Sequence, residues 1–290
     1  MNLRNFCTLL VFLLLNACAP TLTPTQQELM SKAMPMYEGQ FSPIQVPVQL
    51  EYKPVSMNLA GHFAVHTSIR DKDEVFSGEL YGRLRVSPKG DFLLWEFKLE
   101  NAVLGEQKMT SSTPPLVEFR ALRDRYGVTK EGELTITAMK AKSPEENLQV
   151  EELKALLMAQ FKSLSVELPT VPIETGTPLL ELDMNSALQA FEKLWGSPRH
   201  SPPKEKIGYA TRGFGSLKGR KVIVAVLDED FICVSRNERR YSFAMHGYAL
   251  LDPDTAQILE SKTMTTVKSL YSFDSVEFRM LQRVSAEIME

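Results

Sequence analysis

Residues 78–100 read GELYGRLRVSPKGDFLLWEFKLE, and this stretch decides the fold that the rest of the chain follows. From Gly78 to Val86, apolar or small residues occupy every second position, with polar residues and one tyrosine between them. Asp91 to Glu100 alternates in the same way after the turn sequence Ser87–Gly90. A period of two residues is typical of a strand with one buried face, and two such runs around a short turn predict an antiparallel hairpin.

Alternation continues on both sides of this hairpin. Strand signals begin at Ile44, and further strands are expected at residues 116–123, 133–140, 221–227, 240–251, 256–268 and 276–288. Residues 221–227 are apolar on both faces, which predicts a central strand. Residues 276–288 alternate throughout, so the chain is expected to end in a long strand.

Two segments change to helical spacing. Ser143–Glu146 forms a capping box with proline at the first helical position, and apolar residues then recur every three or four positions up to Leu164. We therefore expect an amphipathic helix over residues 144–163 and a shorter one over residues 183–195. An antiparallel β-sheet with one or two packed helices places the chain in the α+β class.

A local repeat suggests that the body, residues 44–290, consists of two related β-meander halves joined around residues 144–196. Tyr81-Gly82 followed by Val86-Ser87-Pro88 matches His246-Gly247 followed by Leu251-Asp252-Pro253 at identical spacing. Each copy belongs to a strand that runs into a proline turn and out into another strand. Two hairpins built by the same rules could converge on this pattern, so duplication remains one of two interpretations.

The N-terminus has the order of a secretory signal. Arg4 supplies positive charge, Phe6–Leu15 is an apolar run, and Leu15–Cys18 closes the run with a small residue and a cysteine. The run is about half as long as the ~20 apolar residues that a transmembrane helix needs. Two alternatives remain. One is an ordinary signal peptide cleaved just before Pro20, although proline is a poor residue at a protease cleavage site. The other is a cytosolic protein, in which the apolar N-terminal run would have no apolar surface to pack against.

Leu15–Cys18 resembles the lipobox of bacterial lipoproteins. The resemblance implies that residues 1–17 are removed as a signal peptide and that Cys18 is lipidated and anchors the protein in a membrane. Ala19, rather than an aspartate, follows the cysteine, and by resemblance to enterobacterial sorting this favours the outer membrane. Residues 18–43 are polar with scattered prolines and are expected to be a flexible tether, with a short helix near residues 26–34.

Composition limits the classes of function. The formal net charge is −3 and becomes −4 when Arg4 leaves with the signal, which speaks against nucleic acid as a partner. The 43% of hydrophobic residues is enough to build a core. Once Cys7 is removed and Cys18 is acylated, Cys233 has no partner for an intrachain disulfide, and its apolar neighbours predict a small buried side chain.

No motif in the sequence marks a catalytic centre, a cofactor or a metal site. Nucleophile-elbow, zinc-protease and paired-cysteine patterns are absent, so we expect a non-enzymatic protein without a cofactor. His62 and His66 have the spacing of helical metal ligands, but they belong to an alternating strand, where four residues span about 13 Å. The acidic run 228–230 lacks the spacing of a calcium loop and is interpreted as a solvated turn.

One segment carries a local excess of positive charge. Residues 199–221 contain a single acid, Glu205, four glycines and seven basic residues. The seven are Arg199, Lys204, Lys206, Arg212, Lys218, Arg220 and Lys221. One interpretation is an anion-binding loop for lipid head groups, an acidic glycan or an acidic partner surface, and the other is a hairpin whose charges face water.

The body also resembles, without a shared motif, the half-barrel folds of periplasmic lipoprotein-localisation factors, in which a curved antiparallel sheet wraps a helix and shelters acyl chains. Together with the lipobox, this resemblance implies a lipid-anchored protein of the bacterial cell envelope. The favoured function is binding of an apolar or acidic ligand, or of a partner protein. A structural or assembly accessory of an envelope complex is the alternative, and a hydrolase comes third.

Overall fold

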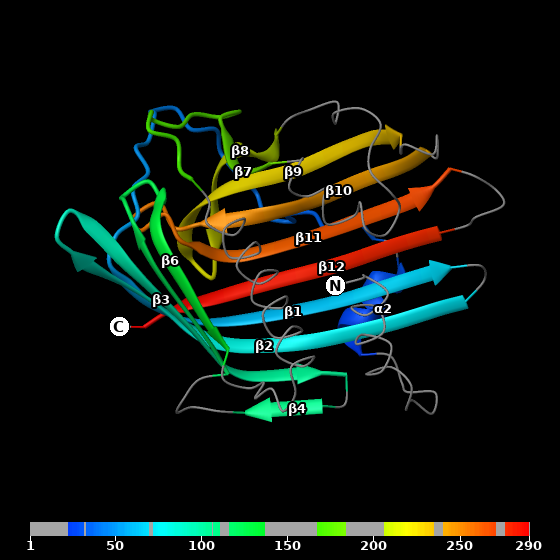
Figure 1. The fold of residues 1–290 in the computed structure, drawn as a ribbon. Helices are drawn as coiled ribbons and strands as arrows, with labels where there is room; N and C mark the ends of the chain where they lie inside the picture. Colours follow the sequence, from blue (N-terminus) through cyan, green and yellow to red (C-terminus); the bar gives the residue numbers. More distant parts are fainter. Residues whose placement is uncertain are drawn as a thin grey trace.

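The computed structural model describes residues 23–31, 33–69, 72–105, 107–110, 116–136, 167–183, 206–234, 240–270 and 276–289. These residues form one antiparallel β-sheet of twelve strands and one short helix, α2 (Pro24–Ser31) (Figure 1). The strands are β1 (Val55–Ile69), β2 (Lys72–Lys89), β3 (Phe92–Leu104), β4 (Gln107–Thr110), β5 (Val117–Arg123), β6 (Thr129–Ile136), β7 (Pro178–Asp183), β8 (Lys206–Leu217), β9 (Arg220–Val234), β10 (Arg240–Leu251), β11 (Ile258–Ser269) and β12 (Val276–Ile288). The expectation of mainly antiparallel β-structure is confirmed. The helices expected over residues 144–163 and 183–195 lie outside the described residues, apart from Asp183, which ends β7.

The C-terminal strand joins the two parts of the sheet. The strand order is β6-β5-β3-β2-β1-β12-β11-β10-β9-β8-β7, with β4 paired to β3 beside this path. β12 pairs with β1 along one edge and with β11 along the other. The first strands of the chain and the last ones therefore belong to one sheet through β12. The sheet is open, since β6 and β7 end the strand order and no pairing joins them in the described part of the chain.

The hairpin of residues 78–100 forms as expected from β2 and β3. Lys89 pairs with Phe92 across the turn, and Leu84 and Val86 are buried on the face predicted to point inward. The central strand expected at residues 221–227 is likewise confirmed within β9, where Val222 to Ala225 are completely buried.

β6 begins four residues before the position expected for this strand. The Asp124 carboxylate accepts hydrogen bonds from the backbone N–H groups of Tyr126 and Val128, at 2.9 and 3.0 Å. These bonds close the turn after β5, so pairing with β5 resumes at Thr129 rather than at residue 133.

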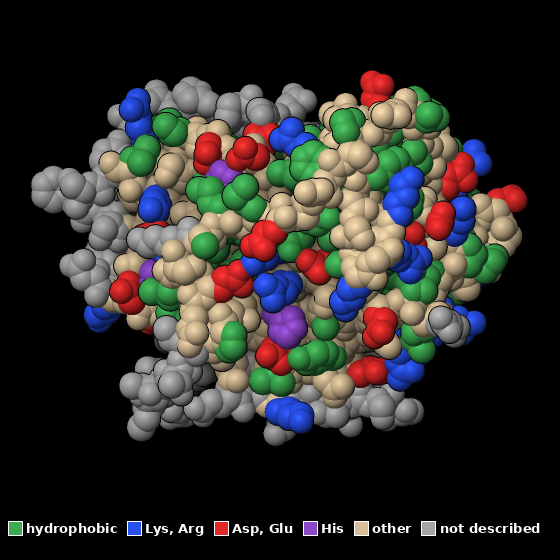
Figure 2. Space-filling view, turned by 180° about the vertical axis from the view of Figure 1, so that it is seen from behind, with side chains coloured by type: hydrophobic (Ala, Val, Ile, Leu, Met, Phe, Trp, Pro, Cys, Tyr) green, Lys and Arg blue, Asp and Glu red, His purple; other side chains and the backbone are tan. Residues whose placement is uncertain are grey.

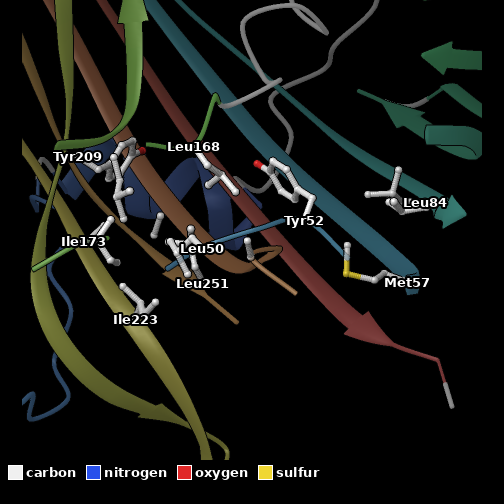
Figure 3. Packing of buried hydrophobic residues seen from close by; sticks show 14 of the residues in the cluster. Leu50, Tyr52, Met57, Leu84, Leu168, Ile173, Tyr209, Ile223 and Leu251 are labelled. Atoms are coloured by element: carbon white, nitrogen blue, oxygen red, sulfur yellow. The ribbon is translucent and has the colours of Figure 1, made fainter. Parts of the chain in front are cut away.

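One face of the sheet, which we call the core face, carries Met57, Leu84, Ile223 and Leu251. Two segments that precede β1 and β7 cover it, and their backbones exchange hydrogen bonds between Val48 and Ile173 at 2.8 and 2.9 Å. Figure 3 shows Leu50, Tyr52, Leu168 and Ile173 from these segments packed against side chains of the strands. Leu50 and Ile173 have no solvent exposure, so this part of the core face is filled.

The opposite face, the strap face, is crossed by α2 and residues 33–43, which we call the strap. Thr23 and Gln26 cap the helix reciprocally: Thr23 Oγ1 accepts from the Gln26 N–H, and Gln26 Oε1 accepts from the Thr23 N–H. Leu29 is fully buried against Ala64, Met264 and Leu281 of three adjacent strands. Within the part of the chain that the structure describes, no helix has the length and apolar character needed to cross a bilayer.

The strap then continues to β8. The Tyr37 hydroxyl donates to the Ser216 carbonyl and accepts from the Ser216 N–H, and Ser42 forms an antiparallel bridge with Phe214. A Cβ atom at Gly213 would lie 2.1 Å from the Ser42 carbonyl oxygen, so glycine permits this close approach. The expected helix near residues 26–34 is present as α2, but residues 24–43 lie against the sheet, whereas a tether would be free of it.

The two copies of the sequence repeat occupy the same structural environment. A Cβ atom at Gly82 would lie 2.3 Å from the Lys98 carbonyl oxygen, and one at Gly247 would lie 2.3 Å from that of Lys262. Both glycines lie in strands that turn into the next strand of a meander, β2 into β3 and β10 into β11. The two copies therefore match in structure as well as in sequence. A duplication of the halves remains a hypothesis.

Candidate functional site

A groove with a volume of about 830 Å³ lies on the strap face, over β9–β12, in the area that the strap leaves uncovered. Its residues are Met34, Asp230, Phe231, Ile232, Ser242, Phe243, Ala244, His246, Met264, Thr266, Lys268, Glu277 and Arg279. Figure 2 shows this side of the molecule, where acidic, basic and histidine side chains are interspersed. Met34 belongs to the strap, so the groove is bounded by an element far from the strands in sequence.

Strand register builds the floor of the groove. Asp230, Ala244, Thr266 and Arg279 lie side by side across β9, β10, β11 and β12. The two middle residues are small and the two outer ones are charged, so the floor is low between an acid and a base. Side chains at alternate positions of each strand point to this face, which places all four together.

A charge network lines the β12 side of the groove. Arg279 Nε donates to Glu277 Oε1 at 2.5 Å, and Lys268 Nζ lies 3.2 Å from the same oxygen. Burial, the largest single effect, raises the pKa of Glu277, but the hydrogen bonds and charges of Arg279 and Lys268 outweigh it and bring the pKa to about 2. Glu277 is therefore a carboxylate at any physiological pH, and it balances one of the two cations.

Arg279 retains hydrogen-bonding capacity on the groove. Its side chain is almost completely buried, and Nη1 has no hydrogen-bond partner among the described residues. A buried donor without an acceptor carries a desolvation penalty of ~1–3 kcal/mol, which a ligand oxygen would relieve. The neighbouring residue on β1 is His66, also buried, with Nε2 3.4 Å from Asp73 Oδ1.

His246 lies between two aspartates at the opposite side of the groove. Its Nδ1 is 2.8 Å from Asp228 Oδ1, and its Nε2 is 3.5 Å from Asp230 Oδ1. A histidine that serves as a general base needs one ring nitrogen turned toward a nucleophile, and here both nitrogens face carboxylates. Ser242 is four residues away along the same strand, about 13 Å at the usual rise per residue, so these residues do not form a nucleophilic triad.

The acidic run 228–230 is not the solvated turn expected from the sequence. Asp228 and Asp230 belong to β9 and pair with His246 and Ala244 of β10. The pairing continues through the acids because alternation puts both aspartates on the exposed strap face, where their side chains remain 70% and 71% exposed. No group of three or more histidine, cysteine or acidic side chains suited to a metal ion is present in the described ranges.

The other residues singled out from the sequence do not line the groove. His62 and His66 lie four residues apart on β1, each beside an acid of β2, and do not converge. Cys233 is buried as expected, and burial raises the pKa of its thiol to about 11, which keeps it protonated and unreactive. Cys18 lies outside the described residues.

The fold brings together only some of the basic residues of segment 199–221. Residues 206–221 form β8, the turn after it and the first residues of β9, while Arg199 and Lys204 lie outside the described residues and Lys206 begins β8. Arg220 donates to the buried Asp252 at 2.8 Å and holds the β10–β11 turn. Lys221 Nζ lies 3.6 Å from the centre of the Phe214 ring, a cation–π contact. Arg212 and Lys218 remain exposed.

The groove itself was missed at the sequence level. Its residues come from Met34 and from four strands between positions 230 and 279, and no short motif connects them. The only sequence signal was the acidic run 228–230, which marks one side of the groove.

Comparison with known proteins gives only coarse likenesses. No family model and no curated protein matches the chain. A solved structure described as lipid–protein interactions in lipovitellin aligns with 82% of this chain and 25% of that chain, at 10% identity and a TM-score of 0.43. This chain therefore spans about a quarter of that one.

Two bacterial structures align over more of their own length. A putative outer membrane lipoprotein-sorting protein domain from Vibrio parahaemolyticus shares 10% identity over 80% of this chain and 85% of that one, with a TM-score of 0.20. A DUF1329 family protein from Desulfovibrio piger shares 6% identity over 79% and 83%, with a TM-score of 0.17. At these scores the comparisons assign this chain to no family.

Proposed function

We propose that this chain is a lipid-anchored, non-enzymatic binding protein of the bacterial cell envelope, and that the groove on its strap face receives a segment of a partner polypeptide. The observation that carries the proposal is the groove over β9–β12, with Arg279 on its floor, whose Nη1 has no hydrogen-bond partner among the described residues. The signal and lipobox of residues 1–18 support the anchor and the envelope location, and Ala19 supports the outer membrane.

The chemistry of the groove suits a polypeptide better than a uniformly charged or purely apolar ligand. Its floor offers donors and acceptors of both charge signs, from Arg279 and Lys268 to Asp230. Met34 and Met264 add adaptable apolar surface, which suits side chains of varied shape. A polypeptide supplies backbone carbonyls for the free arginine donor together with side chains for the apolar parts.

A lipid on Cys18 would bring the groove close to the membrane. Thr23, where the docked chain begins, is five positions after Cys18, and a fully extended chain of that length reaches at most about 18 Å. A lipid on Cys18 would therefore hold the sheet near the bilayer surface. A free tether over residues 18–43 would have allowed a root-mean-square reach of about 25–30 Å.

Crosslinking in cells tests the groove. A photoreactive residue at Ser242, on the groove floor, is expected to give discrete protein adducts, while one at Arg85, exposed on β2, is not. Ala244→Trp fills the floor and should abolish the Ser242 adducts, whereas Ala60→Trp, on the same face of β1, should leave them. Adducts of equal yield in both tryptophan variants would show that the groove does not receive the partner.

The filled core face favours the second candidate function, that of a structural or assembly accessory. Leu50 and Ile173 occupy the space between the covering segments and the sheet, and both are completely buried. This packing favours a structural or assembly accessory of an envelope complex over a carrier that shelters acyl chains at this part of the core face.

A further inference from the structure

Arg123 ends β5 and is buried in the core face, far from the groove. Only 3% of its surface is exposed, and its guanidinium carbon lies 4.6 Å from the centre of the Trp95 ring and 5.9 Å from that of Phe119. Odd-numbered positions of β5 point to the core face, which brings Arg123 into the same layer as Phe119. An arginine at such a position normally has an acidic partner.

No counter-ion of Arg123 is present among the residues that the structure describes. Nε has no hydrogen-bond partner, and the nearby acids are engaged elsewhere: Glu51 with Arg125 at 3.3 Å, and Asp124 with the turn that follows. Tyr52 is the titratable neighbour, and burial raises the pKa of its hydroxyl far above the usual value, so it stays neutral. Burial lowers the pKa of Arg123 to about 10, which leaves the guanidinium charged at neutral pH.

A second donor close to Arg123 also lacks an acceptor. Trp95 is buried beneath the guanidinium, and its Nε1 has no hydrogen-bond partner among the described residues. Tyr52 packs edge-on against the Trp95 ring at 4.8 Å between centres. Arg123 Nε and Trp95 Nε1, two buried donors without acceptors in the part of the chain that the structure describes, can donate to an anionic group, and the aromatic rings around them provide apolar contacts for the body that carries it.

We propose that Arg123 and Trp95 form a binding site for an organic anion, a carboxylate or phosphate carried on an apolar body. The site is independent of the strap-face groove and of its proposed partner. Arg123 is followed by the turn that contains Arg125, whose side chain is 63% exposed, and the ligand is expected to enter at this end of β5. The planar guanidinium stacks on Trp95 and presents its edge to the anion in a bidentate manner.

Trp95 is a built-in reporter for this site. The chain has two tryptophans, and Trp195→Phe leaves Trp95 as the only one in the protein. The full mature chain with this substitution, in a non-ionic detergent, is titrated with hexanoate, hexyl phosphate, inorganic phosphate and hexylammonium while tryptophan emission is recorded. Saturable changes with hexanoate or hexyl phosphate are expected, and the more effective of the two distinguishes a carboxylate from a phosphate ligand.

Substitutions at two arginines of β5 provide the control. Arg123→Met should weaken binding by about ten- to a hundredfold, as expected for the loss of charge-assisted hydrogen bonds. Without ligand it should melt at the same temperature as the parent or higher, because it removes an unpaired buried charge. Arg120→Met, on the other face of the same strand and paired with Glu96 and Glu118, should bind like the parent.

Three results would refute the proposed anion-binding site. These are an equal response to hexylammonium, inorganic phosphate binding as tightly as hexyl phosphate, or unchanged binding in Arg123→Met. If Arg123→Met does not fold, Arg123→Lys keeps the charge and loses the planar fork, and it should bind several-fold more weakly. Binding by Arg123→Lys equal to that of the parent would then refute the proposal.

Discussion

Leu29→Ala is expected to weaken the attachment of the strap to the sheet and to lower the stability of the whole protein. Leu29 is the buried residue of α2, with no solvent exposure, and it packs on Ala64, Met264 and Leu281. Leucine-to-alanine changes at fully buried sites cost ~2–5 kcal/mol. The remaining contacts of the helix add little, because Glu28 forms partly exposed ion pairs with Lys262 and Arg283.

The assay is urea unfolding and thermal melting of the purified protein, with Met36→Ala as the matched control. Met36 lies in the same strap but is 75% exposed, so its removal should change the free energy of unfolding by less than about 0.5 kcal/mol. For Leu29→Ala the melting temperature should fall by about 4–20 °C, since a cost of ~2–5 kcal/mol lowers it by ~2–4 °C per kcal/mol in a domain of this size. If Leu29→Ala unfolds like Met36→Ala, the strap is not docked, and residues 24–43 are the free tether that the sequence suggested.

Three further changes test the sheet, the groove and the basic hairpin. Gly247→Ala should destabilise the protein by about 1–3 kcal/mol, because the new Cβ atom meets a backbone oxygen at 2.3 Å. Gly61→Ala is the control and should be neutral or stabilising, because its Cβ atom would lie 3.7 Å from the nearest atom. Equal stability of the two variants would contradict the close approach of β11 to Gly247 of β10. The folded-state pKa of Glu277, about 2, lies below the value of about 4.3 for an unfolded chain, so its contribution to stability is present above pH ~4.3 and is lost as the pH falls toward 2. Glu277→Gln should flatten this part of the stability profile, and an unchanged acid dependence would refute the ion pairs with Arg279 and Lys268. Replacing Lys204, Lys206, Lys218 and Lys221 with glutamine should leave the melting temperature almost unchanged and sharply reduce binding to anionic vesicles at low salt, and equal binding by both proteins would leave the hairpin as a solvated surface.

The strands with a clear period could be predicted from sequence because burial alone determines their pattern. Leu84 and Val86 alternate with arginines, and residues 222–225 of β9 are apolar at every position since both faces are covered. The docking of the strap could not be predicted, for the opposite reason. A single leucine among polar residues has no period, yet Leu29 is sufficient to dock a capped helix when three strands offer it a complementary surface.

The glycines of β8 have a role that the sequence did not indicate. Gly213 and Gly215 provide room for Ser42 and Tyr37 of the strap. The groove could not have been predicted, because Asp230 and Arg279 become neighbours only through the register of four strands. The excess of basic residues at positions 212–221 is visible in the sequence, but the pairing of Arg220 with Asp252 depends on a contact between distant parts of the chain.

The intact mass of the protein purified from bacterial membranes tests the central claim most directly. If the chain is a lipid-anchored envelope protein, the mass corresponds to a polypeptide that begins at Cys18 and carries acyl and glyceryl groups on that residue. Cys18→Ser should then yield an unprocessed or soluble protein without lipid. A chain that retains residues 1–17, or that begins elsewhere with an unmodified Cys18, would contradict the lipid anchor and the position near the membrane that follows from it.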